Sequence, residues 1–245
     1  MSIASELSRL QQAKSDLATS IANKGVIVPA ATTLDGYAAL VAQIQQGGGT
    51  LPYDAEIEYL QGDGASYIMT SFTPSNTTRI VIKVKDYEEA GRWIFGTRVA
   101  YANRAFGFYA ENSVTSFVSQ FGSNYVVIGN YDLTNSGIVT IDYNGVIKTC
   151  TITSDYSSTL SKAIGNATFT APAPLVLFGL NFNGTSVGSF GKVKLYAASI
   201  YSNGSLVHDF IPVRVGQVGY LYDKVSKTLL GNSGTGSFIL GTDKS

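Results

Sequence analysis

The stretch DFIPVRVGQVGYLYDKVSKTLLGNSGTGSFILG, residues 209–241, decides the fold expected for this chain. Short runs of β-forming residues alternate in it with turn residues. We expect Asp223 to begin a turn that carries Lys224 into solvent. Glycine adopts the positive φ angles of tight turns more easily than residues with a Cβ. The glycines predicted to serve such turns are Gly231, Gly234, Gly236 and Gly241.

The preceding 150 residues show the same strand and turn pattern. Ile80, Ile82 and Val84 alternate with outward positions that include Lys83 and Lys85, as in a strand with one buried face. Asn-Gly is the preferred pair of a two-residue type I′ hairpin turn. It occurs at 144–145 and at 203–204, each time between β-rich flanks. Many short strands joined by such turns predict a two-sheet sandwich.

The closing segment resembles that of the laminin-G-like, concanavalin A-like jelly rolls found in structural proteins of phages and prophages. Four further segments resemble other parts of that family: IEYLQGDGASYIMTSFTPSNTTRI at 57–80, WIFGTR at 93–98, PLVLFGLNFNG at 174–184 and GKVKLYAASIYSNGSLVHDFIP at 191–212. Their order is that of the family, and together they cover about four fifths of the chain. The resemblance therefore implies a mainly β jelly roll over residues 51–245. His208 departs from it, because relatives often carry an arginine before the Asp-Phe pair.

The composition is that of a globular protein without strong charge. Of 245 residues, 44% are hydrophobic and 14% charged, and 17 basic side chains balance 17 acidic ones. Zero net charge gives no electrostatic reason to expect a nucleic-acid partner. No apolar run is long enough to span a bilayer, no secretory signal is visible, and the single Cys150 excludes an internal disulfide. We expect synthesis in a reducing cytoplasm.

Residues 1–46 form a separate region with helical periodicity. Its first apolar positions follow a heptad with Lys14 as one polar member. The residues predicted to mediate oligomerisation are Ile3, Leu7, Leu10, Leu17 and Ile21. About three heptads make a marginal coiled coil that needs other interfaces. A helix packed on its own domain is the alternative.

A second helix is predicted from near Thr33 to Gln46. Its apolar stripe comprises Leu34, Tyr37, Leu40, Val41 and Ile44. The glycine-rich linker 47–50 then marks the domain boundary. The segment IANKGVIVPAATTLDGYAALVAQIQQGGG, residues 21–49, is similar to a short helical module of phage tail and other virion proteins. This resemblance implies a module that oligomerises or attaches to other virion proteins.

Candidate catalytic residues are few. His208 and Asp209 are adjacent in a predicted strand, so their side chains should point to opposite faces and cannot form a Ser-His-Asp unit. We interpret Cys150 as a structural residue. Asp54, Glu56 and Glu58 share one strand face, and neighbouring carboxylates of this kind act in glycosidases. A charged edge strand is the commoner explanation, so we expect no enzyme and keep a glycoside hydrolase as the third alternative.

We expect no metal or other cofactor, with calcium as the alternative. Asp63, Asp132 and Asp142 are turn or strand carboxylates that could contribute to a calcium site of the kind some laminin-G relatives carry. No compact acidic loop accompanies them. An Asp-Gly pair such as residues 63–64 is more often a simple turn.

The middle of the predicted jelly roll is rich in tyrosine and in planar hydrogen-bonding side chains. Aromatic faces beside such groups suit sugar rings. The predicted ligand-binding residues are Tyr101, Tyr109, Tyr131, Asn103 and Arg104, whereas Trp93 is interpreted mainly as a core residue.

These features lead to a non-enzymatic virion protein as the first functional hypothesis. In it, a tail fibre or receptor-binding protein attaches through its N-terminal helices and binds bacterial surface polysaccharide with its jelly-roll head. A homotrimer suits a fibre, although the heptad positions do not choose between dimer and trimer. The second hypothesis is a capsid head fibre or decoration protein with a purely structural role. Both place the protein in a virion assembled in the bacterial cytoplasm.

Overall fold

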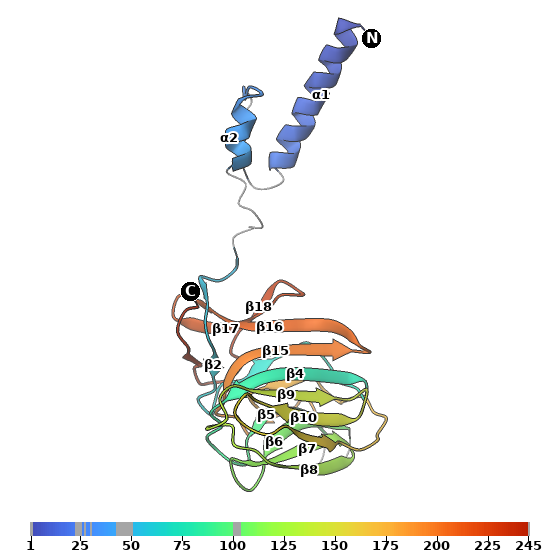
Figure 1. Ribbon diagram of the computed structural model, residues 1–245, viewed down its shortest axis with the longest axis vertical. Coiled ribbons are helices and arrows are strands. Elements are labelled where there is room, and N and C mark those ends of the chain that lie inside the picture. Colours follow the sequence, from blue (N-terminus) through green and yellow to red (C-terminus); the bar gives the residue numbers. More distant parts are fainter. Residues whose placement is uncertain are drawn as a thin grey trace. The chain divides into compact units, whose positions relative to one another are not determined.

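The computed structural model describes residues 2–22, 26, 28–29, 31–42, 51–99 and 104–244 (Figure 1). The chain divides into two compact units, residues 1–51 and residues 52–245. The predicted glycine linker 47–50 lies outside the described residues. In the described ranges no helix is long and apolar enough to cross a membrane.

The first unit contains a long helix and a short one, α1 (Ile3–Ala22) and α2 (Gly36–Ala42). Ile21 near the end of α1 forms a small buried cluster with Tyr37 and Leu40. The other residues predicted to mediate oligomerisation, together called the α1 seam, are exposed: Ile3 by 89%, Leu7 by 56%, Leu10 by 55% and Leu17 by 38%. The predicted oligomerisation residues therefore pack within the chain only at the C-terminal end of α1, and the α1 seam is accessible to a partner.

The second helix starts later than the sequence predicts. Thr33 and Leu34 precede α2 instead of forming its first turn, and Leu34 and Val41 are exposed by 61% and 49%. Of the stripe residues that the structure describes, only Tyr37 and Leu40 are buried, and they form the small cluster with Ile21 of α1. Ile44 and residues 45–46 lie outside the described residues.

The larger sheet of the second unit runs β11-β10-β9-β4-β15-β16-β17-β18, and all of its pairs are antiparallel. The bounds of these strands are β4 (Thr78–Lys85), β9 (Val139–Asn144), β10 (Thr149–Thr153), β11 (Leu160–Ala163), β15 (Lys194–Ser202), β16 (Ser205–Val215), β17 (Val218–Asp223) and β18 (Thr228–Leu230). Short strands join it: β1 (Ala55–Glu56) pairs with β16, and β2 (Leu60–Gln61) pairs with β15 and β19 (Ile239–Leu240).

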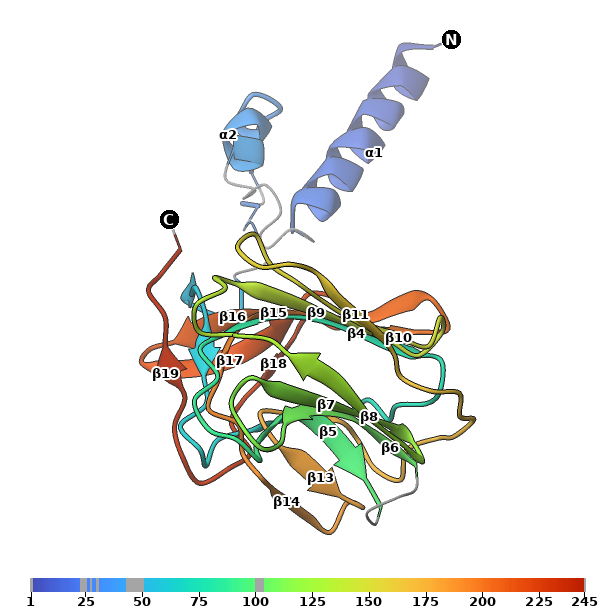
Figure 2. The same ribbon diagram turned by 60° about the horizontal axis from the view of Figure 1, so that its bottom comes forward.

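The second sheet runs β14-β13-β5-β6-β7-β8. Its strands are β5 (Trp93–Arg98), β6 (Ala105–Ala110), β7 (Ser116–Gly122), β8 (Asn124–Asn130), β13 (Leu180–Phe182) and β14 (Ser186–Gly188). The short strand β12 (Val176–Leu177) pairs with β5, and β3 (Ile68–Met69) pairs with β12. The β13–β5 pair is parallel. Figure 2 shows the two sheets stacked as layers, and the predicted mainly β jelly-roll sandwich is confirmed.

Aromatic side chains dominate the core between the sheets. Tyr143 of the larger sheet makes edge contacts with Phe95 and Phe106 of the second, at ring centroid distances of 5.7 and 5.0 Å. Its hydroxyl lies 2.8 Å from Ser119 Oγ and donates to the Gln120 carbonyl oxygen. The polar atom of this fully buried side chain is therefore satisfied, and the ring ties the two layers together.

The two Asn-Gly pairs form different turns. Ser202 pairs with Ser205, and both Asn203 and Gly204 have positive φ (49° and 82°), so the predicted two-residue type I′ turn is confirmed there. The other hairpin is also present, but Asn144 pairs with Thr149 and the loop has four residues, 145–148. The Asn144 side chain accepts N–H bonds from two loop residues and holds this longer turn. The predicted type I′ turn at 144–145 is wrong.

The glycines of the closing segment serve close packing. None of Gly231, Gly234, Gly236 and Gly241 has positive φ, so the predicted conformational reason is wrong. A Cβ on Gly234 would lie 2.1 Å from the Ala65 carbonyl oxygen, and one on Gly236 would lie 2.2 Å from Asp63 Oδ2. The closing segment therefore lies directly on the first loop of the sandwich, where only glycine fits.

Candidate functional site

An open groove of about 780 Å³ lies on the outer face of the larger sheet. Its floor includes Lys83 and Lys85 of β4, Ala197 of β15 and Ile211 of β16. The two lysines point outward because the intervening Val84 points into the core, as the alternation in the sequence predicts. A groove of this volume is in the size range of small-ligand sites.

One wall of the groove carries an exposed tyrosine. Tyr156 has 78% of its surface exposed, yet its ring lies against Gly137, where a Cβ would come within 2.6 Å of Cδ2. Gly137 also has a φ of +71°, so its position favours glycine for two reasons. The Tyr156 ring thus contacts Gly137 on one side, and most of its surface is exposed.

Hydrogen bonds fix the loop that carries Tyr156. Ser154 Oγ accepts N–H bonds from Tyr156 and Ser157, at 3.3 and 3.1 Å. Tyr131, buried in the core, donates its hydroxyl to the same oxygen at 3.0 Å. Ser157 Oγ lies 2.6 Å from Ser136 Oγ in the loop that contains Gly137. The two wall loops are therefore joined to each other and to the core.

The other wall is formed by Tyr196, Glu58 and Lys244. The Tyr196 ring packs against Tyr59 at a centroid distance of 5.6 Å. Lys194 lies 4.9 Å from the centre of the Tyr59 ring and donates to Asp86 at 2.7 Å. Burial raises the pKa of Tyr196 above its usual value, so its hydroxyl is neutral near pH 7 and can donate a hydrogen bond.

Of the five predicted ligand residues, the structure describes Tyr109, Tyr131 and Arg104, and none of these three lines the groove. Tyr101 and Asn103 lie outside the described residues, and Arg104 is exposed with a φ of 53°. Tyr109 and Tyr131 are only 8% and 6% exposed, contrary to the expected free aromatic faces. Tyr131 fills the core instead, since its strand end turns inward toward Ser154.

Tyr109 belongs to a second apolar cluster on the outer face of the β5–β8 sheet. Its ring stacks on Trp93 at 4.3 Å, and the Arg98 guanidinium covers the Trp93 ring at 5.5 Å. Gly96 and Gly107 make room for the indole, because a Cβ on either would come within 2.3 Å of it. The interpretation of Trp93 as a packed residue is confirmed. Strand-interior glycines were the available signal for this packing.

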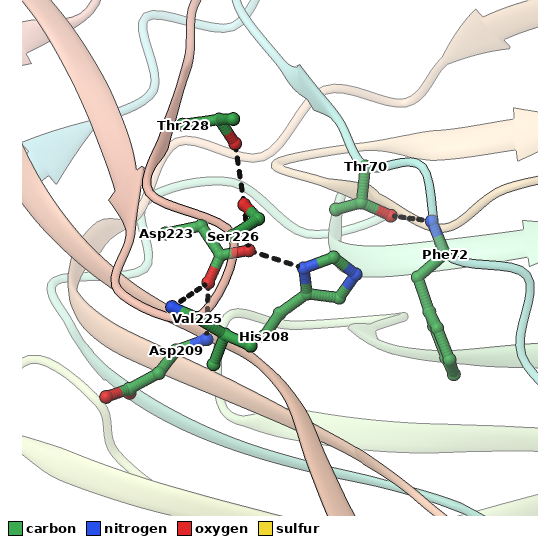
Figure 3. Close-up of polar contacts among 8 residues, drawn as sticks. All are labelled: Thr70, Phe72, His208, Asp209, Asp223, Val225, Ser226 and Thr228. Carbon is green, nitrogen blue, oxygen red and sulfur yellow. Dashed lines mark hydrogen bonds and ion pairs between the residues drawn. The ribbon is translucent and has the colours of Figure 1, made fainter.

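His208 makes an unexpected contact with Asp223 on the neighbouring strand. His208 Nδ1 lies 2.8 Å from Asp223 Oδ2 (Figure 3). Ser226 donates its hydroxyl to the same carboxylate, and the backbone N–H groups of Asp209 and Val225 donate to Oδ1 at 2.9 and 3.0 Å. Asp209 itself faces the other way, toward Ser199 and Lys224, as predicted.

The Asp223 carboxylate is held ionised. Burial raises its pKa, but the hydrogen bonds from Asp209, Ser226, His208 and Val225 outweigh this effect and lower the pKa to about 2. Ser226 donates to the carboxylate and not to the imidazole, so this set lacks the serine-to-histidine bond of a catalytic triad. The cluster joins β16, β17 and the turn that follows Asp223.

The carboxylate triplet of the first strand does not converge. Asp54 accepts the Gly216 N–H at 2.6 Å, and Glu56 accepts the Tyr53 hydroxyl at 3.3 Å. Of the three, only Glu58 lines the groove. Cys150 is fully buried, and burial raises the pKa of its thiol, as expected for a structural cysteine.

The residues considered for calcium are engaged elsewhere. Asp63 accepts N–H bonds from Ala65, Ser66 and Ser237. Asp142 forms two bonds with Arg79, at 2.8 and 2.6 Å, and Asp132 accepts from Thr134 and Asn135. Within the described residues no group of three or more His, Cys, Asp or Glu side chains could hold a metal ion.

No family model matches the chain, and no curated protein matches it. Among solved structures, it is similar to a Bacteroides ovatus ATCC 8483 protein assigned to carbohydrate binding, with 11% identity and a TM-score of 0.48 over 78% of this chain and 61% of that one. A structure of NanB with optactamide matches at 11% identity and a TM-score of 0.32, over 73% of this chain and 38% of that one. SCP-B, an eqolisin-family peptidase in complex with Ala-Ile-His, matches at 14% identity and a TM-score of 0.33, over 74% of this chain and 100% of that one. At these identities and scores the matches assign no activity to the chain.

Proposed function

We propose that this protein is a non-enzymatic, glycan-binding component of a virion, and that its sandwich binds saccharide in the groove over β4, β15 and β16. The groove carries the proposal, because it combines tyrosine rings with charged and hydrogen-bonding groups around an open floor. Tyr156 offers a free aromatic face, and the neutral Tyr196 hydroxyl is a hydrogen-bond donor. Sugar rings are recognised by stacking on aromatic faces and by directed polar contacts.

A binding role fits the polar side chains better than hydrolysis. The Asp223 carboxylate already accepts bonds from four residues, and two of the three Asp54, Glu56 and Glu58 carboxylates are engaged outside the groove. A retaining glycosidase needs two carboxyl groups about 5 to 5.5 Å apart. Glu58 and Asp155 are the carboxylates that line the groove, and they come from different segments, Glu58 just after β1 and Asp155 just after β10.

The virion assignment rests on the resemblance of the closing segment and of the helical module. The exposed seam of Ile3, Leu7, Leu10 and Leu17 supports self-association, for which a homotrimer suits a fibre. Several copies on one particle would compensate for weak binding at each groove. A tail fibre or receptor-binding protein is the first role. A capsid head fibre or decoration protein is the second, since the same seam could attach it to a capsid.

Binding of the intact protein to a panel of bacterial surface polysaccharides tests the glycan proposal. We expect Tyr156→Ala to weaken binding by about 10-fold or more, because it removes the stacking face. Tyr125→Ala is the matched control: this tyrosine is 49% exposed on the outer face of the other sheet and does not line the groove. Equal losses in the two variants, or no binding to any polysaccharide, would contradict the proposal.

Cryo-electron microscopy of the assembled particle tests the role. A helical unit held in a tail or baseplate, with the sandwich free, favours receptor binding. A chain that coats or projects from the capsid favours decoration. Absence of the chain from the particle would overturn the virion assignment and leave the binding test untouched.

A further inference from the structure

Three basic residues, Arg79, Lys83 and Lys85, point outward from β4, and they differ in whether an acidic side chain pairs with them. Arg79 donates two bonds to Asp142 of β9, at 2.8 and 2.6 Å. Lys83 and Lys85 make no ion pair and no hydrogen bond with any residue that the structure describes. One end of the strand is thus neutralised within the sheet, and the end in the groove is not.

The cross-strand neighbours explain why the two lysines remain unpaired. Lys83 lies between Ala197 of β15 and Thr140 of β9, neither of which carries a charge. Lys85 lies opposite Lys194, whose ammonium group is bonded to Asp86. Opposite charges in these positions would stabilise the sheet and neutralise the lysines, but the sheet contains none there.

Three further charged residues, Lys244, Glu58 and Asp155, line the groove. Lys244 lies 3.9 Å from Glu56, so that pair is loose and exposed. Glu58 and Asp155 line the groove but do not come within 4.0 Å of any described lysine or arginine nitrogen. Side chains two residues apart on a strand are roughly 6.6 Å apart at their Cα atoms, close enough for two flexible lysines to reach one acidic group.

We propose that the groove selects an anionic saccharide, whose acidic group binds between Lys83 and Lys85 while a sugar ring lies on Tyr156. This inference rests on the proposed glycan-binding function and specifies its substrate class. A carboxylate of a uronic acid and a phosphate of a sugar-phosphate polymer both supply the required charge and acceptor oxygens. Glu58 and Asp155 limit the selection by repelling acidic groups placed outside the lysine pair.

The test measures binding of the intact protein to three probes by calorimetry: an oligogalacturonate, a glycerol phosphate oligomer and a neutral galactan oligomer. We expect at least one acidic probe to bind about 10-fold more tightly than the neutral one, and its affinity to fall as salt is raised. Whichever acidic probe binds identifies the source of the negative charge. Equal affinity for acidic and neutral probes overturns the inference.

Variants separate this inference from the proposed function. Lys83→Gln and Lys85→Gln should each weaken acidic-probe binding by about 3- to 10-fold and weaken neutral-probe binding less, whereas Lys83→Arg and Lys85→Arg should keep the preference for the acidic probe. Lys162→Gln makes the same charge change on β11, outside the groove, and should have no effect. If a neutral glycan binds and Tyr156→Ala abolishes it while the lysine variants do nothing, the glycan function stands and the anionic selection fails. If no probe or polysaccharide binds, both fail.

Discussion

The two units of the chain differ sharply in how they bury apolar surface. The sandwich holds a continuous core that includes Phe95, Phe106 and Tyr143 between its sheets. The helical unit buries a cluster of Ile21, Tyr37 and Leu40, and leaves most of the α1 seam in solvent. Fold stability scales with buried apolar area, and most of a helix's stability in a protein comes from packing its apolar face. The sandwich can therefore fold on its own interactions, whereas α1 gains most from a partner.

The largest expected effect is a cavity in the sandwich. Phe106→Ala removes a fully buried ring that contacts Phe95, Phe121 and Tyr143. We expect a loss of about 3–5 kcal/mol in the free energy of unfolding, measured by urea denaturation. Ile3→Ala, at an 89% exposed position of α1, should change the sandwich transition by less than about 0.5 kcal/mol. Similar losses in both variants would remove the distinction between the units.

A second, smaller effect concerns the carboxylate that joins β16 to β17. The folded-state pKa of Asp223 is lowered from 3.8 to about 2, so its ionised form stabilises the fold above pH 4. That contribution is lost as the pH falls from about 4 to below 2, and amounts to about 2 kcal/mol. Asp223→Asn should flatten this part of the stability-versus-pH curve, measured by chemical denaturation. Asp155→Asn, in an exposed loop, is the control; an unchanged curve for Asp223→Asn would refute the assignment.

Glycine substitutions in the two units should change the free energy of unfolding by similar or smaller amounts. Gly234→Ala would place its Cβ 2.1 Å from the Ala65 carbonyl oxygen, so the sandwich should lose about 1–3 kcal/mol. Gly36→Ala in α2 meets the Thr32 methyl group at 3.1 Å and gains helix propensity, so its effect should stay within about 0.5 kcal/mol. Thermal unfolding followed by circular dichroism measures both. A loss for Gly36→Ala equal to that for Gly234→Ala would mean that the helical unit is packed as tightly as the sandwich.

The smallest effect on the sandwich should come from the α1 seam. Leu7→Gln and Leu10→Gln place polar groups at positions that are 56% and 55% exposed within one chain. The sandwich transition should move by less than about 0.5 kcal/mol. The proposed oligomer should dissociate, because a coiled-coil interface depends on its apolar positions. Light scattering after size-exclusion chromatography measures this. Arg9→Gln, on α1 but outside the heptad positions and with a side chain that is 76% exposed, is the matched control. An oligomer that survives both leucine changes would exclude the seam as its interface.

The strands could be predicted because residues close together in the sequence determine them. Ile80, Ile82 and Val84 alternate with outward residues, and the turn at 203–204 follows from two residues that tolerate positive φ. The turn at 144–145 could not be predicted in detail, since the Asn144 side chain stabilises a four-residue loop instead. The prediction for Gly234 and Gly236 was wrong for a related reason, because their contacts are with Ala65 and Asp63, about 170 positions earlier in the sequence.

The groove could not be predicted from the sequence, because seven segments that are distant in the sequence form it. Outward orientation of Lys83 and Lys85 could be derived from alternation alone. Their meeting with Tyr156 and Tyr196 depends on the order of strands β9, β4 and β15 in the sheet. Tyr131 shows the converse, since a tyrosine chosen as a ligand contact instead anchors, from the core, the loop that carries Tyr156.

The pairing of β1 with β16 also has a mechanical consequence. Ala55 lies opposite Arg214 and Glu56 opposite Val213, and Ile211 of the same β16 strand forms part of the groove floor. Tension between a ligand held in the groove and the chain entering at residue 52 would thus pass through two adjacent strands and bypass the aromatic core. Loss of the short β1–β16 pairing under load would therefore reach the groove, because Glu58, two residues beyond β1, lines it.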